Sequence, residues 1–197
     1  MITTDDLILE YVYLLKTKIK HLMNPYVLNC PDCAYHGLNS EELLDKLIHL
    51  RNNGYIFFSI SNDVIKENFS DNSELSKIPF VDSWSVGLTE KGGIRWESLF
   101  NPIWEKYTDF VSESLTNDLY RITLQTGTKE NMEYILQKYG NSITSISEVI
   151  ELNPWYPVYW RSVDKGFVVT FHVSENVMDN WELAREIYET NWRIKAW

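Results

Sequence analysis

The stretch that decides the fold begins with Leu38-Asn39-Ser40-Glu41-Glu42-Leu43-Leu44-Asp45-Lys46-Leu47-Ile48-His49-Leu50-Arg51-Asn52-Asn53-Gly54. Its leucines and isoleucine recur at the spacing of one helical face, so residues 38–53 are predicted to form an amphipathic helix. Asn39 followed by Glu42 is a capping box, and Gly54 supplies the left-handed residue that ends the helix. The broad apolar face indicates that this helix packs on a core.

The chain after this helix alternates between strands and helices. Strands are predicted at residues 55–60 and 84–88, separated by a polar segment, 62–79, that carries one short helical turn at 64–68. The sequence Leu88-Thr89-x-x-Gly92 then begins a helix over residues 90–100. A third helix, two wing strands and this entry into the next helix resemble the winged helix-turn-helix fold. The resemblance covers residues 4–114 and implies a shape that many DNA-binding regulators share.

Two further helices complete the first half. Apolar residues recur every three or four positions through residues 4–22, and Thr3 with Asp6 forms a second capping box. Residues 24–37, where the winged helix places its second helix, contain prolines and read as a loop. A helix is also predicted over residues 103–114, because Pro102 suits a first-turn position.

The second half has a different pattern. Polar residues cluster at 114–118, which predicts a boundary between a winged-helix-like domain, residues 1–114, and a second domain, residues 115–197. The second domain is expected to contain a strand at 120–124, a helix at 129–139, a hairpin of strands 157–163 and 167–173, and a final helix at 179–196. The predicted fold class is therefore α+β, with a small antiparallel sheet that has helices on one face.

Composition narrows the classes of function. The chain of 197 residues has a formal net charge of −10 and a pI of about 4.9. This charge opposes attraction to the phosphates of nucleic acids and favours a protein partner of basic character. Eight Trp and twelve Tyr residues supply the side chains that interfaces use most.

Targeting and membrane signals are missing from the sequence. The acidic N-terminal residues lack the basic region of a signal peptide, and no apolar run reaches the length of about 18 residues that spans a bilayer. We therefore expect a cytoplasmic protein without a membrane partner.

The sequence Cys30-x-x-Cys33-x-x-His36 is the one pattern with metal-ligand spacing. Thiolates and imidazoles at such spacing can share a tetrahedral zinc ion, and a Cys-x-x-Cys pair can also act as a redox dithiol. A single pair without a second one is a weak signal, so the interpretation we favour is two ordinary loop cysteines. No cofactor is predicted.

Two features favour a protein interface. On the predicted last helix, acids share one face and form a ridge that includes Glu182, Glu186 and Glu189. In the predicted hairpin, strand alternation buries one set of aromatic residues and leaves Tyr159 or Trp160 facing outward. A solvated helix face and an ordinary aromatic core are the alternative interpretations of these two features.

DNA recognition is the alternative function. It would place the helical segment 40–53 in a major groove, with Lys46, Arg51, Lys91 and Arg95 as the plausible contacts. Acids at the start of this helix would repel phosphates. No catalytic motif is present, because nucleophile elbow, zinc-protease and phosphate-loop patterns all fail. The leading hypothesis is a non-enzymatic protein-interaction module of the acidic immunity or antitoxin kind, and the second is a DNA-binding regulator with a C-terminal dimerisation or sensing domain.

Overall fold

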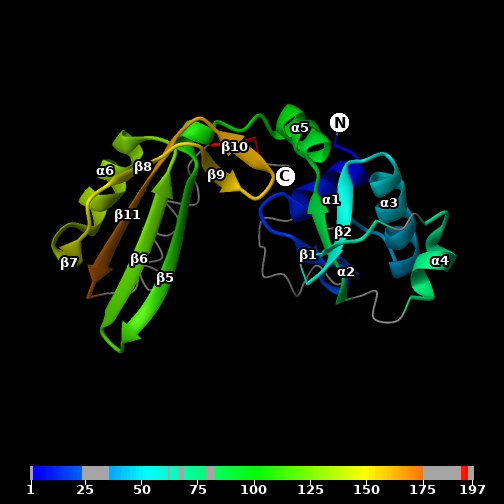
Figure 1. The fold of residues 1–197 in the computed structure, drawn as a ribbon, viewed down its shortest axis with the longest axis horizontal. Helices are drawn as coiled ribbons and strands as arrows, with labels where there is room; N and C mark the ends of the chain where they lie inside the picture. Colours follow the sequence, from blue (N-terminus) through cyan, green and yellow to red (C-terminus); the bar gives the residue numbers. More distant parts are fainter. Residues whose placement is uncertain are drawn as a thin grey trace. The chain divides into compact units, whose positions relative to one another are not determined.

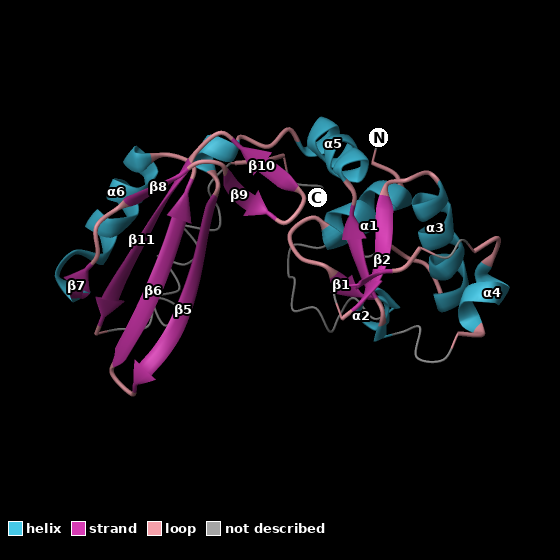
Figure 2. Ribbon diagram, in the orientation of Figure 1, coloured by secondary structure: helices cyan, strands magenta, loops and turns pink. Residues whose placement is uncertain are grey.

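The structure is a computed structural model that describes residues 2–23, 36–61, 63–66, 69–78, 83–174 and 192–194. The chain divides into two compact units. Unit 1 is formed by Met1–Asn101, Val158–Arg161 and Ile194–Trp197, and unit 2 is formed by Pro102–Pro157 and Ser162–Arg193. Helices and antiparallel strand pairs occur together, so the predicted α+β class is confirmed (Figure 2).

Unit 1 combines helices with a small sheet (Figure 1). Its elements are, in chain order, α1 (Thr4–Val12), β1 (Thr17–Lys18), α2 (Ile19–Met23), α3 (Ser40–Asn52), β2 (Ile56–Ile60), β3 (Asp63–Val64), α4 (Asn72–Ser76), β4 (Ser85–Leu88) and α5 (Glu90–Phe100). The strand order is β1-β4-β2-β3. The core of the unit joins residues from α1, α3, the sheet and α5, namely Ile8, Leu9, Leu43, Leu47, Phe58, Val86, Trp96 and Phe100.

The predicted helix ends are confirmed at four places. Both capping boxes form: Thr3 pairs with Asp6, and Asn39 with Glu42. Gly54 has a φ of +73°, the left-handed conformation that ends α3. Thr89 caps α5, since its hydroxyl accepts a hydrogen bond from the backbone N–H of Gly92 at 3.0 Å.

The prediction of one helix over residues 4–22 is wrong. α1 ends at Val12, and Thr17 pairs with Val86 of β4 instead of continuing the helix. The Thr17 hydroxyl donates to the carbonyls of Tyr11 and Leu15, a local alternative to helical bonding that threonine favours. Leu15 belongs to the apolar pattern that predicts one buried helical face over residues 4–22, yet its side chain is 69% exposed.

The polar segment after β2 also differs from the prediction. Val64 lies in the short strand β3, where it pairs with Ser59, and not in a helical turn. Asp71 begins α4, a helix that the prediction missed, by accepting a hydrogen bond from the backbone N–H of Glu74 at 3.1 Å.

Unit 2 is built on a five-stranded sheet. Its elements are the 3-10 helix η3 (Trp104–Lys106), β5 (Thr108–Thr116), β6 (Leu119–Thr126), α6 (Lys129–Tyr139), the 3-10 helix η4 (Gly140–Ser142), β7 (Ile143–Ile146), β8 (Ile150–Leu152), β9 (Trp155–Val158), β10 (Arg161–Val163) and β11 (Gly166–Val173). The sheet order is β5-β6-β11-β7, with β8 also paired to β11. α6 covers one face of the sheet (Figure 2). On that face Met132, Ile135 and Tyr139 form a core cluster with Ile122, Leu124 and Phe171.

The helix predicted over residues 103–114 is wrong, because most of that segment is strand β5. β5 and β6 form a hairpin that pairs Phe110 with Leu124 and Glu113 with Arg121. The segment 114–118, predicted as a boundary between residues 1–114 and 115–197, forms the turn end of this hairpin, and unit 2 begins at Pro102.

The predicted hairpin of strands 157–163 and 167–173 is also wrong in its pairing. Residues 155–163 form their own two-stranded sheet, β9 with β10, and β11 pairs with β6, β7 and β8. Phe167, Val169, Phe171 and Val173 nevertheless share the α6 side of the sheet, as their alternation predicts. The helix predicted over residues 179–196 lies largely outside the described residues.

Candidate functional site

The solvent-facing side of α3 is acidic. Glu41, Glu42 and Asp45 are exposed along its first two turns, while its leucines are buried. Glu42 also accepts a hydrogen bond from the backbone N–H of Asn39 at 2.9 Å. The part of α3 that a groove-binding helix would present to DNA therefore carries negative charge.

Lys46, the first predicted DNA contact, lies beside a carboxylate of unit 1. Its Nζ atom is 3.0 Å from Oδ1 of Asp5 on α1. His49 is on the same side, with Nε2 4.0 Å from the other oxygen of Asp5. The Lys46 side chain is 42% exposed, so this ion pair is partly solvated and of modest energy.

Arg95, on α5, is held by a buried carboxylate. Its Nε and Nη2 atoms donate to Oδ1 of Asp6 at 3.0 and 2.6 Å, and its guanidinium lies over the ring of Tyr55. Burial by itself would raise the pKa of Asp6. Hydrogen bonds from the Thr3 hydroxyl and backbone N–H, together with Arg95, outweigh burial and lower that pKa.

This arrangement predicts a pH-dependent contribution to stability. Because the pKa of Asp6 is lower folded than unfolded, its stabilisation is full above the unfolded value and is lost as pH falls through the folded value. At neutral pH, Asp6→Asn should reduce the free energy of unfolding by about 2 kcal/mol, since it breaks a pair whose carboxylate is buried. Urea unfolding at neutral pH and at about pH 2 should show this gap closing in acid.

Asp45→Asn is the matched control, because it removes the same charge from an exposed position of α3. It should change stability by less than about 0.5 kcal/mol at either pH. An equal loss in both variants would mean that net charge, and not the Asp6–Arg95 contact, controls the pH dependence.

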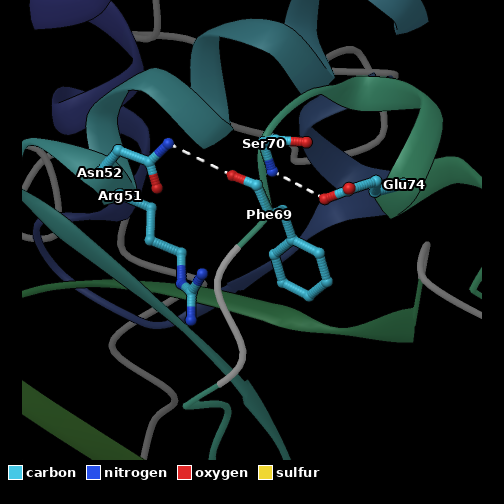
Figure 3. Close-up of a pocket in the computed structure, with 5 residues that line it drawn as sticks. All are labelled: Arg51, Asn52, Phe69, Ser70 and Glu74. Carbon is cyan, nitrogen blue, oxygen red and sulfur yellow. Dashed lines mark hydrogen bonds between the residues drawn. The ribbon is translucent and has the colours of Figure 1, made fainter.

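Arg51 lines a pocket of about 570 Å³ between the end of α3 and the start of α4 (Figure 3). Its Nη2 atom donates to the carbonyl of Ile65 at 2.9 Å, and the guanidinium lies over the rings of Phe58 and Phe69. The neighbouring polar groups of the pocket bond to each other, as the Asn52 amide does to the Phe69 carbonyl at 3.3 Å. Arg51 therefore holds the α3–β2 region together.

Lys91 is bound at the end of α3. Its Nζ atom donates to the carbonyl of Asn53 at 2.8 Å and lies 4.8 Å from the centre of the Tyr55 ring. All four predicted DNA contacts thus have partners within unit 1. Asp5 and Asp6, which hold two of these cations, lie in the first turn of α1, where local spacing predicts only a role in helix capping.

Glu10 is a second buried acid that the sequence did not identify as a contact residue. It lies one turn after Asp6 on α1 and is 3% exposed, and its Oε2 atom accepts from Nε1 of Trp96 at 2.6 Å. Asp6 and Glu10 are four residues apart on a helix that has an apolar face. This spacing is the sequence signal that could have identified both acids as contact residues.

Tyr159 and Trp160, the predicted outward-facing aromatics, are anchored within unit 1. The Tyr159 hydroxyl donates to the carbonyl of Val12 at 2.7 Å and accepts from the backbone N–H of Leu88. Burial raises the pKa of that hydroxyl, and the bond from Leu88 lowers it less. Tyr156 is the exposed aromatic of this region, at 62%.

Trp160 occupies the space beside α5. Its Nε1 atom donates to the carbonyl of Tyr13 at 2.7 Å, and its ring meets Trp96 edge-on with centroids 5.9 Å apart. A Cβ atom on Gly93 would lie 2.0 Å from this ring, so glycine is required there. The next residue, Arg161, pairs with Glu97 at 2.8 Å.

The Tyr159→Phe variant tests whether the hydrogen bonds of the Tyr159 hydroxyl stabilise unit 1. Removing the hydroxyl should lower the free energy of unfolding by about 1–3 kcal/mol, because two buried backbone groups lose their partner. Tyr156→Phe makes the same chemical change at an exposed position and should have almost no effect. Chemical denaturation followed by circular dichroism compares the two, and equal stabilities would contradict an anchoring role.

His36 does not offer a nitrogen to a metal ion. Nε2 is 2.8 Å from the carbonyl of Leu22, and Nδ1 accepts the backbone N–H of Leu38 at 3.1 Å. Among the described residues, no group of three or more His, Cys, Asp and Glu side chains is placed to hold a metal. Cys30 and Cys33 lie outside the described residues, as do Glu182, Glu186 and Glu189 of the predicted acidic ridge.

Comparison of the chain with family models, with curated proteins and with solved structures finds no match. Within the described part of the chain, no helix combines the length and the apolar composition needed to cross a bilayer.

Proposed function

We propose that this chain is a protein-interaction module that acts without catalysing a reaction, of the small acidic immunity or antitoxin kind, with a partner of basic character. The observation that most strongly supports this proposal is the arrangement of charged side chains in unit 1. Lys46, Arg51, Lys91 and Arg95 are engaged by the chain's own atoms, whereas acids face solvent on α3. Together with a net charge of −10, this arrangement supports binding to cationic protein rather than to phosphate.

A winged-helix arrangement of unit 1 is part of this proposal. Three helices, α1 to α3, precede the antiparallel neighbours β2 and β4, and Leu88-Thr89-x-x-Gly92 begins α5. This order supports the second candidate function, a DNA-binding regulator whose C-terminal unit dimerises or senses an effector. The four cationic side chains already bind groups of the chain itself, which argues against DNA binding. A cytoplasmic location is compatible with both candidate functions.

Binding to two probes separates the candidates. A fluorescent random-sequence duplex and a fluorescent polylysine peptide would each be titrated with the full chain at low salt. We expect saturable binding of polylysine and none of the duplex. Micromolar duplex affinity that falls steeply with salt would favour the regulator and overturn the interaction module.

Paired variants assign any duplex binding to a surface. Lys46→Gln with Lys91→Gln removes two of the proposed DNA contacts, and Lys129→Gln with Lys138→Gln removes the same charge from α6. Loss of duplex binding in the first pair alone would establish α3 and α5 as the DNA-binding surface.

A further inference from the structure

Three lysines occupy alternate positions of unit 1 between the end of α1 and the start of α2. Lys16 directly precedes β1, Lys18 lies in β1, and Lys20 lies in α2. All three are exposed, whereas Thr17 and Ile19 between them are buried. Five consecutive residues span at most about 14 Å of backbone, so these lysines form one local patch of positive charge.

The three lysines are not paired with acids of the described residues. None of the ion pairs in that part of the chain includes Lys16, Lys18 or Lys20. Lys16 instead lies over an aromatic ring, with its Nζ atom 5.6 Å from the centre of Phe57. These lysines therefore differ from the four predicted DNA contacts, which all bind groups of unit 1.

The lysines border the face of the unit 1 sheet that points away from the core. Phe58 of β2 and Val86 of β4 are fully buried in that core. Strand alternation places their paired neighbours Phe57 and Gly87 on the opposite face, the outer face of the sheet. A Cβ atom on Gly87 would lie 2.6 Å from the Phe57 ring, so this ring lies across β4 and reaches Lys16.

Exposed apolar side chains accompany the lysines. Leu14 and Leu15, which directly precede them, are 40% and 69% exposed. Val64 of β3 pairs with Ser59, two residues after Phe57, so it shares the outer face, and it is 53% exposed. Leucines in water beside ammonium groups suit a ligand that offers both negative charge and an apolar layer.

We propose that this part of unit 1 binds the surface of a bilayer that contains anionic lipids. The contact residues form the lysine–leucine patch, which consists of Leu14, Leu15, Lys16, Lys18 and Lys20. The lysines would lie at the lipid phosphates, and the leucines would enter the boundary between headgroups and acyl chains. The cytoplasmic leaflet carries the anionic lipids that such a patch requires.

This inference goes beyond the proposed function and does not depend on it. The sequence led us to expect no membrane partner because no segment could span a bilayer, but surface binding needs no such segment. A protein partner at the acidic face of α3 and a bilayer at the lysine–leucine patch would use different surfaces of unit 1.

The acids of α3 do not cancel the charge of the patch. They face solvent on the side of the helix away from its buried leucines, whereas the lysines border the outer face of the sheet. A helix with its side chains is about 10–12 Å across. This exceeds the Debye length of about 8 Å at physiological ionic strength, so the attraction between the lysines and nearby lipid phosphates is only weakly opposed.

Two other interpretations of the lysines leave the leucines unexplained. Nucleic acid phosphates attract lysines, but a sugar-phosphate backbone offers leucine no apolar layer. Lysines also protect edge strands from pairing with other chains, and β1 lies at one end of the described sheet. Neither role requires Leu14 and Leu15 to be exposed, so the leucines favour the bilayer.

Cosedimentation of the full chain with vesicles tests the proposal. One set of vesicles contains phosphatidylcholine alone, and the other also contains about 30% phosphatidylserine. We expect the chain to bind the second set only, with an affinity that falls as salt is added. The same chain would be titrated with a fluorescent random-sequence duplex, to which we expect no binding.

Charge variants locate the surface. Lys18→Gln with Lys20→Gln removes two exposed charges from the patch, and Lys106→Gln with Lys165→Gln removes the same charge from exposed positions of unit 2. Each lysine at an anionic surface contributes about fivefold in affinity, so we expect the first pair to weaken vesicle binding at least about tenfold. The second pair should change it less than about twofold. Circular dichroism checks that both proteins fold.

A leucine variant separates a bilayer from other anionic ligands. Leu15→Gln removes an apolar side chain from the patch without a change of charge, and Ile150→Gln makes a similar change at a 58% exposed position of β8. We expect Leu15→Gln to weaken vesicle binding at least about fivefold, because a leucine that enters the bilayer loses its contact with water. Ile150→Gln should have almost no effect.

The remaining outcomes overturn the proposal and leave the protein-interaction module intact. They are no binding to either set of vesicles, or equal binding to both. Duplex binding that Lys18→Gln with Lys20→Gln abolishes and Leu15→Gln leaves unchanged would assign the patch to nucleic acid. Unchanged vesicle binding by the lysine variant, together with self-association in light scattering, would show that the lysines only protect the edge of the sheet.

Discussion

Replacing Trp96 with alanine is expected to destabilise unit 1 by about 3–5 kcal/mol, the loss typical of a large aromatic removed from a packed core. Trp96 is fully buried on α5. Its ring stacks on Tyr13 with centroids 4.5 Å apart and contacts Phe100 and Trp160 at 5.2 and 5.9 Å. Alanine would remove these contacts together and leave a cavity between α1, α5 and the residue 158–161 segment.

Trp96→Phe separates packing from hydrogen bonding. Phenylalanine keeps most of the ring contacts but cannot donate to Glu10, so a smaller loss of about 1–3 kcal/mol is expected. Denaturation followed by circular dichroism measures both losses, and hydrogen exchange of α1 and α5 amides shows whether unit 1 is the part affected. An alanine variant no less stable than the phenylalanine variant would mean that the ring contributes little packing energy.

Gly92→Ala is expected to cost about 3 kcal/mol, the upper end of the range for overpacked sites. A Cβ atom at this position would lie 1.9 Å from the carbonyl oxygen of Tyr55. That carbonyl also accepts the backbone N–H of Thr89 at 3.0 Å, so it is fixed where α5 begins. The helix start and the residue 54–55 segment would have to separate.

Glu90→Ala, in the same helical turn, is the control. Glu90 is exposed, and its loss should cost about 0.5 kcal/mol through the helix dipole. Thermal unfolding compares the two variants. A Gly92→Ala protein as stable as Glu90→Ala would show that the close approach of the Tyr55 carbonyl is not needed in the folded state.

Local signals predicted the parts of the fold whose causes are local. α6 spans Lys129–Tyr139, the range expected from its periodicity, and Gly140 follows it with a positive φ. α3 begins at its predicted cap, because Asn39 and Glu42 satisfy each other's backbone groups within one turn. Such elements need no information about distant residues.

Elements set by distant partners were predicted poorly. Residues 13–22 have a helical apolar pattern, yet Thr17 pairs with Val86, far away in sequence. The polar and apolar residues of β5 do not alternate, so the sequence has no strand pattern there and its strand character depends on pairing with β6. The turn residues Asn117 and Asp118 were the signal of this hairpin, and they were interpreted as a domain boundary instead.

The residues of the candidate surfaces show the same difference between local features, which the sequence predicts, and distant contacts, which it does not. The charge composition predicts an acidic protein-interaction module. The acids exposed on α3 could be identified from the sequence, because they lie on the polar side of a predicted amphipathic helix. The sequence did not show that Arg95 would meet Asp6, or that Tyr159 would meet Val12, because these contacts join residues 89 and 147 positions apart. Spatial pairing of that kind is not encoded in local spacing.

The anchoring of Tyr159 and Trp160 has a consequence for how this polypeptide can be divided. Unit 1 draws on three separate stretches of the chain, so a fragment that stops at Asn101 lacks two aromatic rings that fill its own interior. A single crossover after Asn101 therefore cannot transfer unit 1 intact to another protein. A recombinant that keeps only residues 1–101 must replace the rings of Tyr159 and Trp160.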